Sequence, residues 1–145
     1  MVTQYKFYYD FGSPNSYLSH LIIPSIEKRN RISFDYVPIL LGGIFKLTGN
    51  ISPVESLKSV KNKSEYLELE TNRFLEKYGI TSYKFNPYFP LNTLTLMRGA
   101  LFAKSKPYYE EYINAIYKSI WANPKKVDNE EILKAVLAEA RLPAD

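Results

Sequence analysis

Residues 5–16 are the most informative stretch of this 145-residue chain and read YKFYYDFGSPNS. Residues 5–11 are rich in aromatic side chains, which favour a β-strand, and they show no helical period. Gly12, Ser13 and Pro14 interrupt this strand, and apolar residues at spacings of three and four then predict a helix up to about residue 30. Residues 32–37 alternate as a second strand does, and Pro38 ends the run. This order predicts a βαβ unit with two parallel strands.

From residue 42 onward the pattern is helical. We predict helices near residues 64–78, 92–104, 107–121 and 129–141, a short apolar segment at 44–47 and a rigid, proline-containing aromatic loop at 85–90. Two strands alone make a poor sheet, so this pattern is typical of a fold that lacks its remaining strands. We therefore divide the chain into a βαβ segment over residues 1–40 and a helical segment over residues 41–145.

The composition excludes several kinds of site. The chain has no cysteine, which excludes disulfides, a thiolate zinc site, an iron–sulfur cluster and thiol redox chemistry by the protein itself. His20 is the single histidine, so a Ser-His-Asp triad or a multi-histidine metal centre is disfavoured, and we expect no metal. The net charge of +4 is weak support for nucleic acid, and we expect none as a partner.

The sequence also bears on location. No apolar run approaches the roughly 18 residues of a membrane-spanning helix. Residues 1–6 lack the apolar segment of a secretion signal. We therefore expect a cytoplasmic protein without a membrane partner.

Ser13 lies where the first strand gives way to the helix. Free backbone N–H groups and the positive end of the helix dipole favour an anion at that position, and a serine hydroxyl can donate a hydrogen bond to it. A serine without a neighbouring histidine base is a poor nucleophile. The alternative role is structural, with Ser13 or Asn15 capping the helix and Pro14 at its first position. The residues alone leave both roles open.

Residues 7–18, FYYDFGSPNSYL, resemble the active-site opening of the glutathione-dependent 2-hydroxychromene-2-carboxylate isomerases and the kappa-class glutathione transferases. These families belong to the DsbA-like branch of the thioredoxin fold, and they carry Ser-Pro-x-Ser where their redox relatives carry Cys-x-x-Cys. Further segments are similar in the same order: LGGIFKLTGN at 41–50, KSEY at 63–66 with RF at 73–74, and NPYFPLNTL at 86–94 with MRGA at 97–100.

The resemblance implies an α/β fold, a thioredoxin-like βαβ unit with a large all-helical insertion. It covers nearly the whole chain, whereas the chain covers only the N-terminal part of the family. Family members continue into a cis-proline loop, a β-hairpin and a pair of residues that grips the γ-glutamyl end of glutathione. We therefore expect the C-terminal βα part of the fold to be absent from this chain.

The resemblance also implies roles for individual residues. Ser13 would be the catalytic residue that holds the glutathione sulfur as a thiolate, with Pro14 beside it in the glutathione site. Asn50 would bind the tripeptide backbone, and Lys63 would bind an anionic group nearby. Asn92 and Thr93 would flank an aromatic acceptor pocket, although capping of the helix that follows Pro90 is an equally good role for them.

The implied function is glutathione-dependent cis–trans isomerisation of a small aromatic 2-oxo acid. The thiolate would add to an activated double bond, permit rotation and then be eliminated. A kappa-like transferase acting on an electrophile is the close variant. An alternative from another class is a truncated, non-catalytic module that binds glutathione or a partner. We also expect a homodimer, because two strands leave an open edge and an uncovered apolar face.

Overall fold

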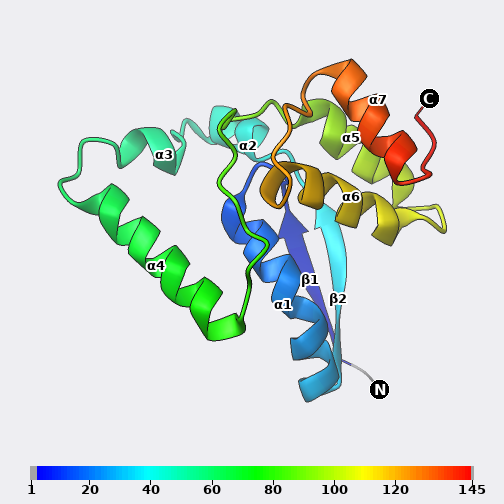
Figure 1. The fold of residues 1–145 in the computed structure, drawn as a ribbon, viewed down its shortest axis with the longest axis horizontal. Helices are drawn as coiled ribbons and strands as arrows, with labels where there is room; N and C mark the ends of the chain where they lie inside the picture. Colours follow the sequence, from blue (N-terminus) through cyan, green and yellow to red (C-terminus); the bar gives the residue numbers. More distant parts are fainter. Residues whose placement is uncertain (1–2, 145) are drawn as a thin grey trace. The chain divides into compact units, whose positions relative to one another are not determined.

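The computed structural model describes residues 3–144 and begins with the predicted strand, helix and strand (Figure 1). These elements are β1 (Thr3–Tyr9), α1 (Pro14–Asn30) and β2 (Ile32–Pro38). The helices that follow within this range are α2 (Leu41–Thr48), α3 (Pro53–Ser56), α4 (Lys63–Tyr78), α5 (Leu94–Ala103), α6 (Tyr109–Trp121) and α7 (Glu130–Glu139). The α/β fold class is confirmed.

The two strands pair in parallel, as predicted. Their register runs from Thr3 opposite Ile32 to Tyr9 opposite Pro38, and the described residues contain no third strand in this sheet. A helix connects them, as a parallel crossover requires. The carboxyl end of β1 therefore leads directly into the turn that precedes α1.

α1 begins where local signals predict it to begin. Ser13 occupies the N-cap position and Pro14 the first helical position, where the missing N–H of proline costs no hydrogen bond. The helix continues through Pro24 and ends at Asn30, after which Arg31 adopts a left-handed conformation with φ of 53°. This end fixes the short connection to β2.

The chain forms two compact units, residues Met1–Ile39 with Lys84–Asp145, and residues Leu40–Tyr83. The first boundary lies beside the one that we predicted at residues 40 and 41. Residues 84–145, which we had assigned to the helical segment, group instead with the βαβ unit. The physical reason is burial, because Tyr117 and Trp121 of α6 are completely buried and contact Tyr9, Phe11 or both.

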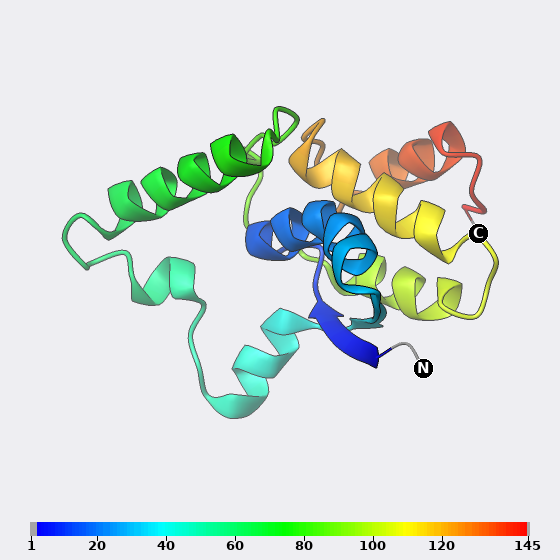
Figure 2. The ribbon, with the colours of Figure 1, turned by 90° about the horizontal axis from the view of Figure 1, so that it is seen from below.

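Within the first unit, α6 lies beside α1 and packs against α5 and α7 (Figure 2). The core of this unit is aromatic to an unusual degree. Its largest fully buried side chains include Tyr9, Phe11, Tyr117 and Trp121. The rings of Tyr9, Phe11 and Tyr117 meet one another edge-on or tilted. Such pairs add about 0.5–1.5 kcal/mol each beyond the burial of their area.

The second unit contains α2, α3 and α4, in which no residue is buried. α2 is followed by Gly49 and α4 by Gly79, and both glycines have the positive φ that glycine adopts without strain. Large apolar side chains of this unit are exposed, among them Leu47, Ile51 and Leu69. Over residues 3–144 as a whole, the helices fall short of the length and apolar character needed to cross a lipid bilayer.

Candidate functional site

The turn between β1 and α1 is organised by Asp10. Its carbonyl oxygen accepts a hydrogen bond from the Ser13 N–H at 3.1 Å, and its Oδ1 accepts one from the Gly12 N–H at 2.9 Å. Asp10 itself is buried. Two hydrogen bonds that Asp10 accepts thus close a tight turn and bring Ser13 to the start of the helix.

The Ser13 side chain caps α1, so the structural role that the sequence left open is confirmed. Its Oγ accepts a hydrogen bond from the Ser16 N–H at 3.2 Å. Capping uses a lone pair of the hydroxyl oxygen and leaves the hydroxyl hydrogen available to another acceptor. Ser13 and Pro14 are half-buried and Asn15 is exposed. Capping and donation to a ligand are therefore compatible in Ser13.

Side chains from α5 and α6 hold this turn in place. The Trp121 indole Nε1–H donates to the Phe11 carbonyl oxygen at 2.8 Å, and the Phe11 N–H lies 3.5 Å from Met97 Sδ. Ser16 Oγ and the Tyr117 hydroxyl share a buried hydrogen bond of 2.7 Å. The helical period of residues 107–121 indicates that Tyr117 and Trp121 are buried, but it does not indicate the partners of their polar atoms.

Thr93 lies against the same turn. It is buried, and a Cβ atom added to Gly12 would lie 3.1 Å from its Cγ2. A larger residue at position 12 would have to displace Thr93, which gives Gly12 a steric reason to be glycine. The structure thus brings Ser13, Pro14 and Thr93 into one neighbourhood.

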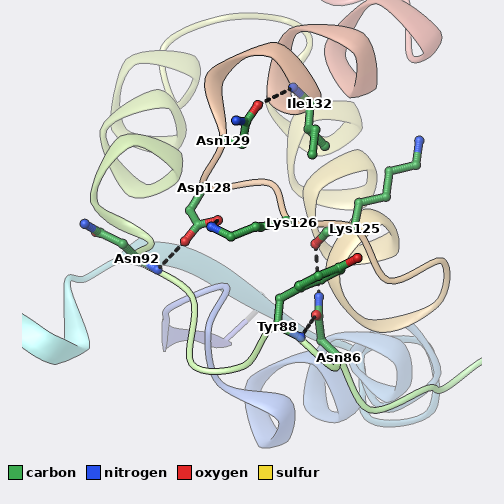
Figure 3. Close-up of polar contacts among 8 residues, drawn as sticks. All are labelled: Asn86, Tyr88, Asn92, Lys125, Lys126, Asp128, Asn129 and Ile132. Atoms are coloured by element: carbon green, nitrogen blue, oxygen red, sulfur yellow. Dashed lines mark hydrogen bonds and ion pairs between the residues drawn. The ribbon is translucent and has the colours of Figure 1, made fainter.

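Asn92 is exposed and serves the start of α5 (Figure 3). Its Oδ1 accepts a hydrogen bond from the Leu94 N–H at 3.1 Å, and its own N–H donates to Asp128 Oδ2 at 3.4 Å. Thr93, at the N-cap position of α5, makes no side-chain capping bond. The helix-start role is therefore confirmed for Asn92, while the acceptor pocket stays a prediction for both residues.

The aromatic loop before α5 is tied to the end of α6 by Asn86 (Figure 3). This completely buried side chain donates through Nδ2 to the carbonyl oxygens of Ile120 (3.0 Å) and Lys125 (3.1 Å). Its Oδ1 accepts from the Tyr88 N–H at 2.9 Å. The Phe89–Pro90 peptide bond of this loop is cis. Sequence reasoning predicted a rigid loop here but did not single out Asn86.

Asn50 and Lys63 belong to the second unit, whereas the other predicted site residues belong to the first. Asn50 is exposed just after α2, and its Nδ2 donates to Thr48 Oγ1 at 3.0 Å. Lys63 is the first residue of α4, with Nζ 5.0 Å from the centre of the Tyr66 ring. Their roles toward glutathione stay predictions.

His20 is held by two side chains. Its Nε2 lies 2.8 Å from Asn114 Oδ1 and its Nδ1 lies 2.8 Å from the Tyr36 hydroxyl. An amide oxygen only accepts, so the neutral ring carries its hydrogen on Nε2 and accepts at Nδ1. Burial lowers the pKa of His20 from its ordinary value. Among residues 3–144, side chains of the metal-binding types form no group of three that could hold a metal ion.

Residues 4–145 match the family of DSBA-like thioredoxin domains. The chain belongs to this family. This match confirms the thioredoxin-like fold that the resemblance implied.

Curated relatives are similar to this DsbA-like chain over nearly all of its length. The 2-hydroxychromene-2-carboxylate isomerase of Pseudomonas putida is 27% identical over 135 residues, which are 92% of the chain. The protein of the same name from Sphingobium xenophagum is 26% identical over 145 residues, the full chain. The chain spans 63% and 72% of these two relatives. Its own activity is therefore a matter for proposal.

A solved structure agrees with the fold. The selenomethionine form of a 2-hydroxychromene-2-carboxylate isomerase superposes with a TM-score of 0.77 at 23% identity. The similarity covers 98% of this chain and 68% of the other. At that identity the likeness supports the arrangement of the helices and strands.

Proposed function

We propose that this chain carries the glutathione-binding turn of an isomerase of the 2-hydroxychromene-2-carboxylate type. In this proposal the Ser13 hydroxyl donates a hydrogen bond to the glutathione sulfur. The observation that carries the proposal is the bonding of Ser13, whose oxygen accepts from the Ser16 N–H and keeps its own hydrogen for a ligand. The names of the curated relatives support the reaction type.

The donors at this turn suit a thiolate. Ionising a thiol with a pKa of about 8.5 at pH 7 costs about 2 kcal/mol. A hydrogen bond to a charged group contributes about 1.5–3 kcal/mol, and the N-terminus of a helix about 0.3–1 kcal/mol. These contributions together are enough to keep the bound thiol ionised without a general base. Asp10, the carboxylate of this turn, is buried and accepts a hydrogen bond from the Gly12 N–H.

When bound, glutathione supplies a nucleophilic sulfur that adds reversibly to a conjugated double bond, so that the bond can rotate. The chain supplies the surroundings. Ser13 orients and stabilises the sulfur. Thr93, which packs beside Gly12, forms one wall of the space beside the sulfur. We assign Asn92 to the rim of the acceptor pocket, Asn50 to the tripeptide backbone and Lys63 to an anionic group.

The decisive assay combines the chain, glutathione and 2-hydroxychromene-2-carboxylate and follows the ultraviolet spectrum of the substrate. We expect isomerisation that requires catalytic glutathione and is strongly reduced in Ser13→Ala. Stoichiometric loss of glutathione with an electrophile would favour the kappa-like transferase instead. Glutathione binding without either reaction would favour a binding module, and no binding at all would contradict the proposal.

The homodimer stays a prediction. It is supported by the exposed apolar side chains of the second unit, among them Leu47 and Ile51, which contact with another copy would cover. Light scattering over a dilution series measures this directly. A strictly monomeric, folded chain would contradict it.

A further inference from the structure

α6 contacts the Ser13 turn at two points, one helical turn apart. Tyr117 and Trp121 are four residues apart and so lie on the same face of the helix. Tyr117 reaches Ser16, three residues after Ser13, and Trp121 reaches the carbonyl of Phe11, two residues before it. The two contacts thus bracket Ser13 along the chain.

Ser16 connects Tyr117 to Ser13. Its side-chain oxygen bonds the Tyr117 hydroxyl at 2.7 Å, and its backbone N–H donates to Ser13 Oγ at 3.2 Å. Ser16 is buried and Tyr117 is completely buried, so neither hydroxyl can readily exchange its partner for water. Burial also raises the pKa of Tyr117, which keeps its hydroxyl protonated at neutral pH.

We propose that Tyr117 is a positioning residue for Ser13, which it holds through the hydrogen bonds of Ser16. The hydrogen bond between the Tyr117 and Ser16 hydroxyls fixes the first turn of α1 and, with it, the Ser16 N–H that orients the Ser13 hydroxyl. Trp121 fixes the peptide on the other side of the turn. The consequence for the reaction rests on the proposed function, whereas the geometric effect on Ser13 does not.

Tyr117→Phe tests this inference because it removes one oxygen and keeps the buried ring. The Ser16 hydroxyl would then lack its partner and turn to a backbone carbonyl of the preceding residues, which distorts the start of a helix. The matched control is Tyr112→Phe on the same helix. Tyr112 is also buried, and its hydroxyl donates to the Leu96 carbonyl oxygen at 2.9 Å, so both variants lose one buried hydrogen bond.

The first readout needs no ligand. Amide hydrogen exchange at Ser16 and Tyr17 reports whether the first turn of α1 stays closed, since both N–H groups donate to Ser13. We expect exchange to be roughly tenfold faster in Tyr117→Phe, as the loss of one hydrogen bond produces, and nearly unchanged in Tyr112→Phe. Equal exchange in the two variants would overturn the inference.

The second readout is the pKa of the glutathione thiol in the complex. We expect Tyr117→Phe to raise it and Tyr112→Phe to leave it unchanged. Ser16→Ala should raise it as well, and the double variant should equal the single ones, because both act through one hydrogen bond. Additive effects would overturn the inference. If the original chain binds no thiolate, the proposed function fails, and amide exchange still decides the role of Tyr117.

Discussion

Replacing Ser13 with alanine removes the hydroxyl group at the centre of the site and affects two interactions. The first is the capping bond to the Ser16 N–H, whose loss costs about 1 kcal/mol of stability. The second is the proposed bond to the thiolate, worth about 1.5–3 kcal/mol. At 1.36 kcal/mol per unit, this second loss raises the pKa of bound glutathione by about one to two units.

A control variant separates these two effects. Asn129 caps α7 in the same way, since its Oδ1 accepts from the Ile132 N–H at 3.1 Å. Asn129→Ala should therefore lower the melting temperature about as much as Ser13→Ala while leaving the thiolate unchanged. Ser13→Asp keeps an acceptor for the Ser16 N–H but adds a negative charge, so we expect little thiolate at neutral pH.

The assay is a pH titration of the ultraviolet thiolate absorbance of bound glutathione, at saturating glutathione, for each variant. Thermal unfolding of the same samples gives the capping contribution. If Ser13→Ala and Asn129→Ala lose similar stability and titrate alike, Ser13 is a helix cap and nothing more. That result would refute its proposed role toward the sulfur.

Three further predictions concern stability and redox chemistry. Burial lowers the pKa of His20 by more than the nearby charge of Glu110 raises it, so protonation of His20 favours the unfolded chain. The free energy of unfolding should therefore fall as the pH drops below about 6.5, and His20→Gln should abolish this fall. Gly99→Ala places a methyl group on the hydroxyl of Tyr112, and this crowding outweighs a gain in helix propensity of about 1 kcal/mol. We therefore expect urea denaturation to show that the free energy of unfolding falls by more than about 1 kcal/mol, and unchanged stability would contradict this. Without cysteine, the chain should not reduce insulin disulfides, and turnover above a protein-free control would contradict that expectation.

The parts of the fold that depend on neighbouring residues were predictable from the sequence. The aromatic run of β1, the cap at Ser13 and the end of the predicted helix at residue 78 depend on local signals, and the structure confirms each of them. The differences are also local. The first strand ends at Tyr9 rather than residue 11, because Asp10 already accepts the bond that closes the turn.

The sequence did not predict the short helices α2 and α3 as helices. The sequence predicted only a short apolar segment at residues 44–47, whereas α2 begins earlier and includes Gly42 and Gly43 in its first turn. A helix tolerates each of them at a cost of about 1 kcal/mol relative to alanine. The short helix α3 escaped prediction because it contains only Pro53–Ser56. Runs this short carry too few residues for a periodic signal.

The contacts that hold the candidate site were not predictable in this way. Ser16 and Tyr117 are 101 residues apart, and Phe11 and Trp121 are 110 apart. An apolar stripe on α6 indicates that Tyr117 and Trp121 are buried, but it does not indicate which polar atoms they meet. That information arises only when α6 packs beside α1.

The structure also separates the two serines of the Ser-Pro-x-Ser motif. Ser13 precedes the helix and is half-buried at its start, whereas Ser16 is buried and bonded to Tyr117. A ligand that approaches the N-terminus of α1 therefore meets the Ser13 hydroxyl, while Ser16 is committed to the protein interior. We therefore propose different roles for the two serines, in which Ser13 donates to the ligand and Ser16 holds Ser13 in position.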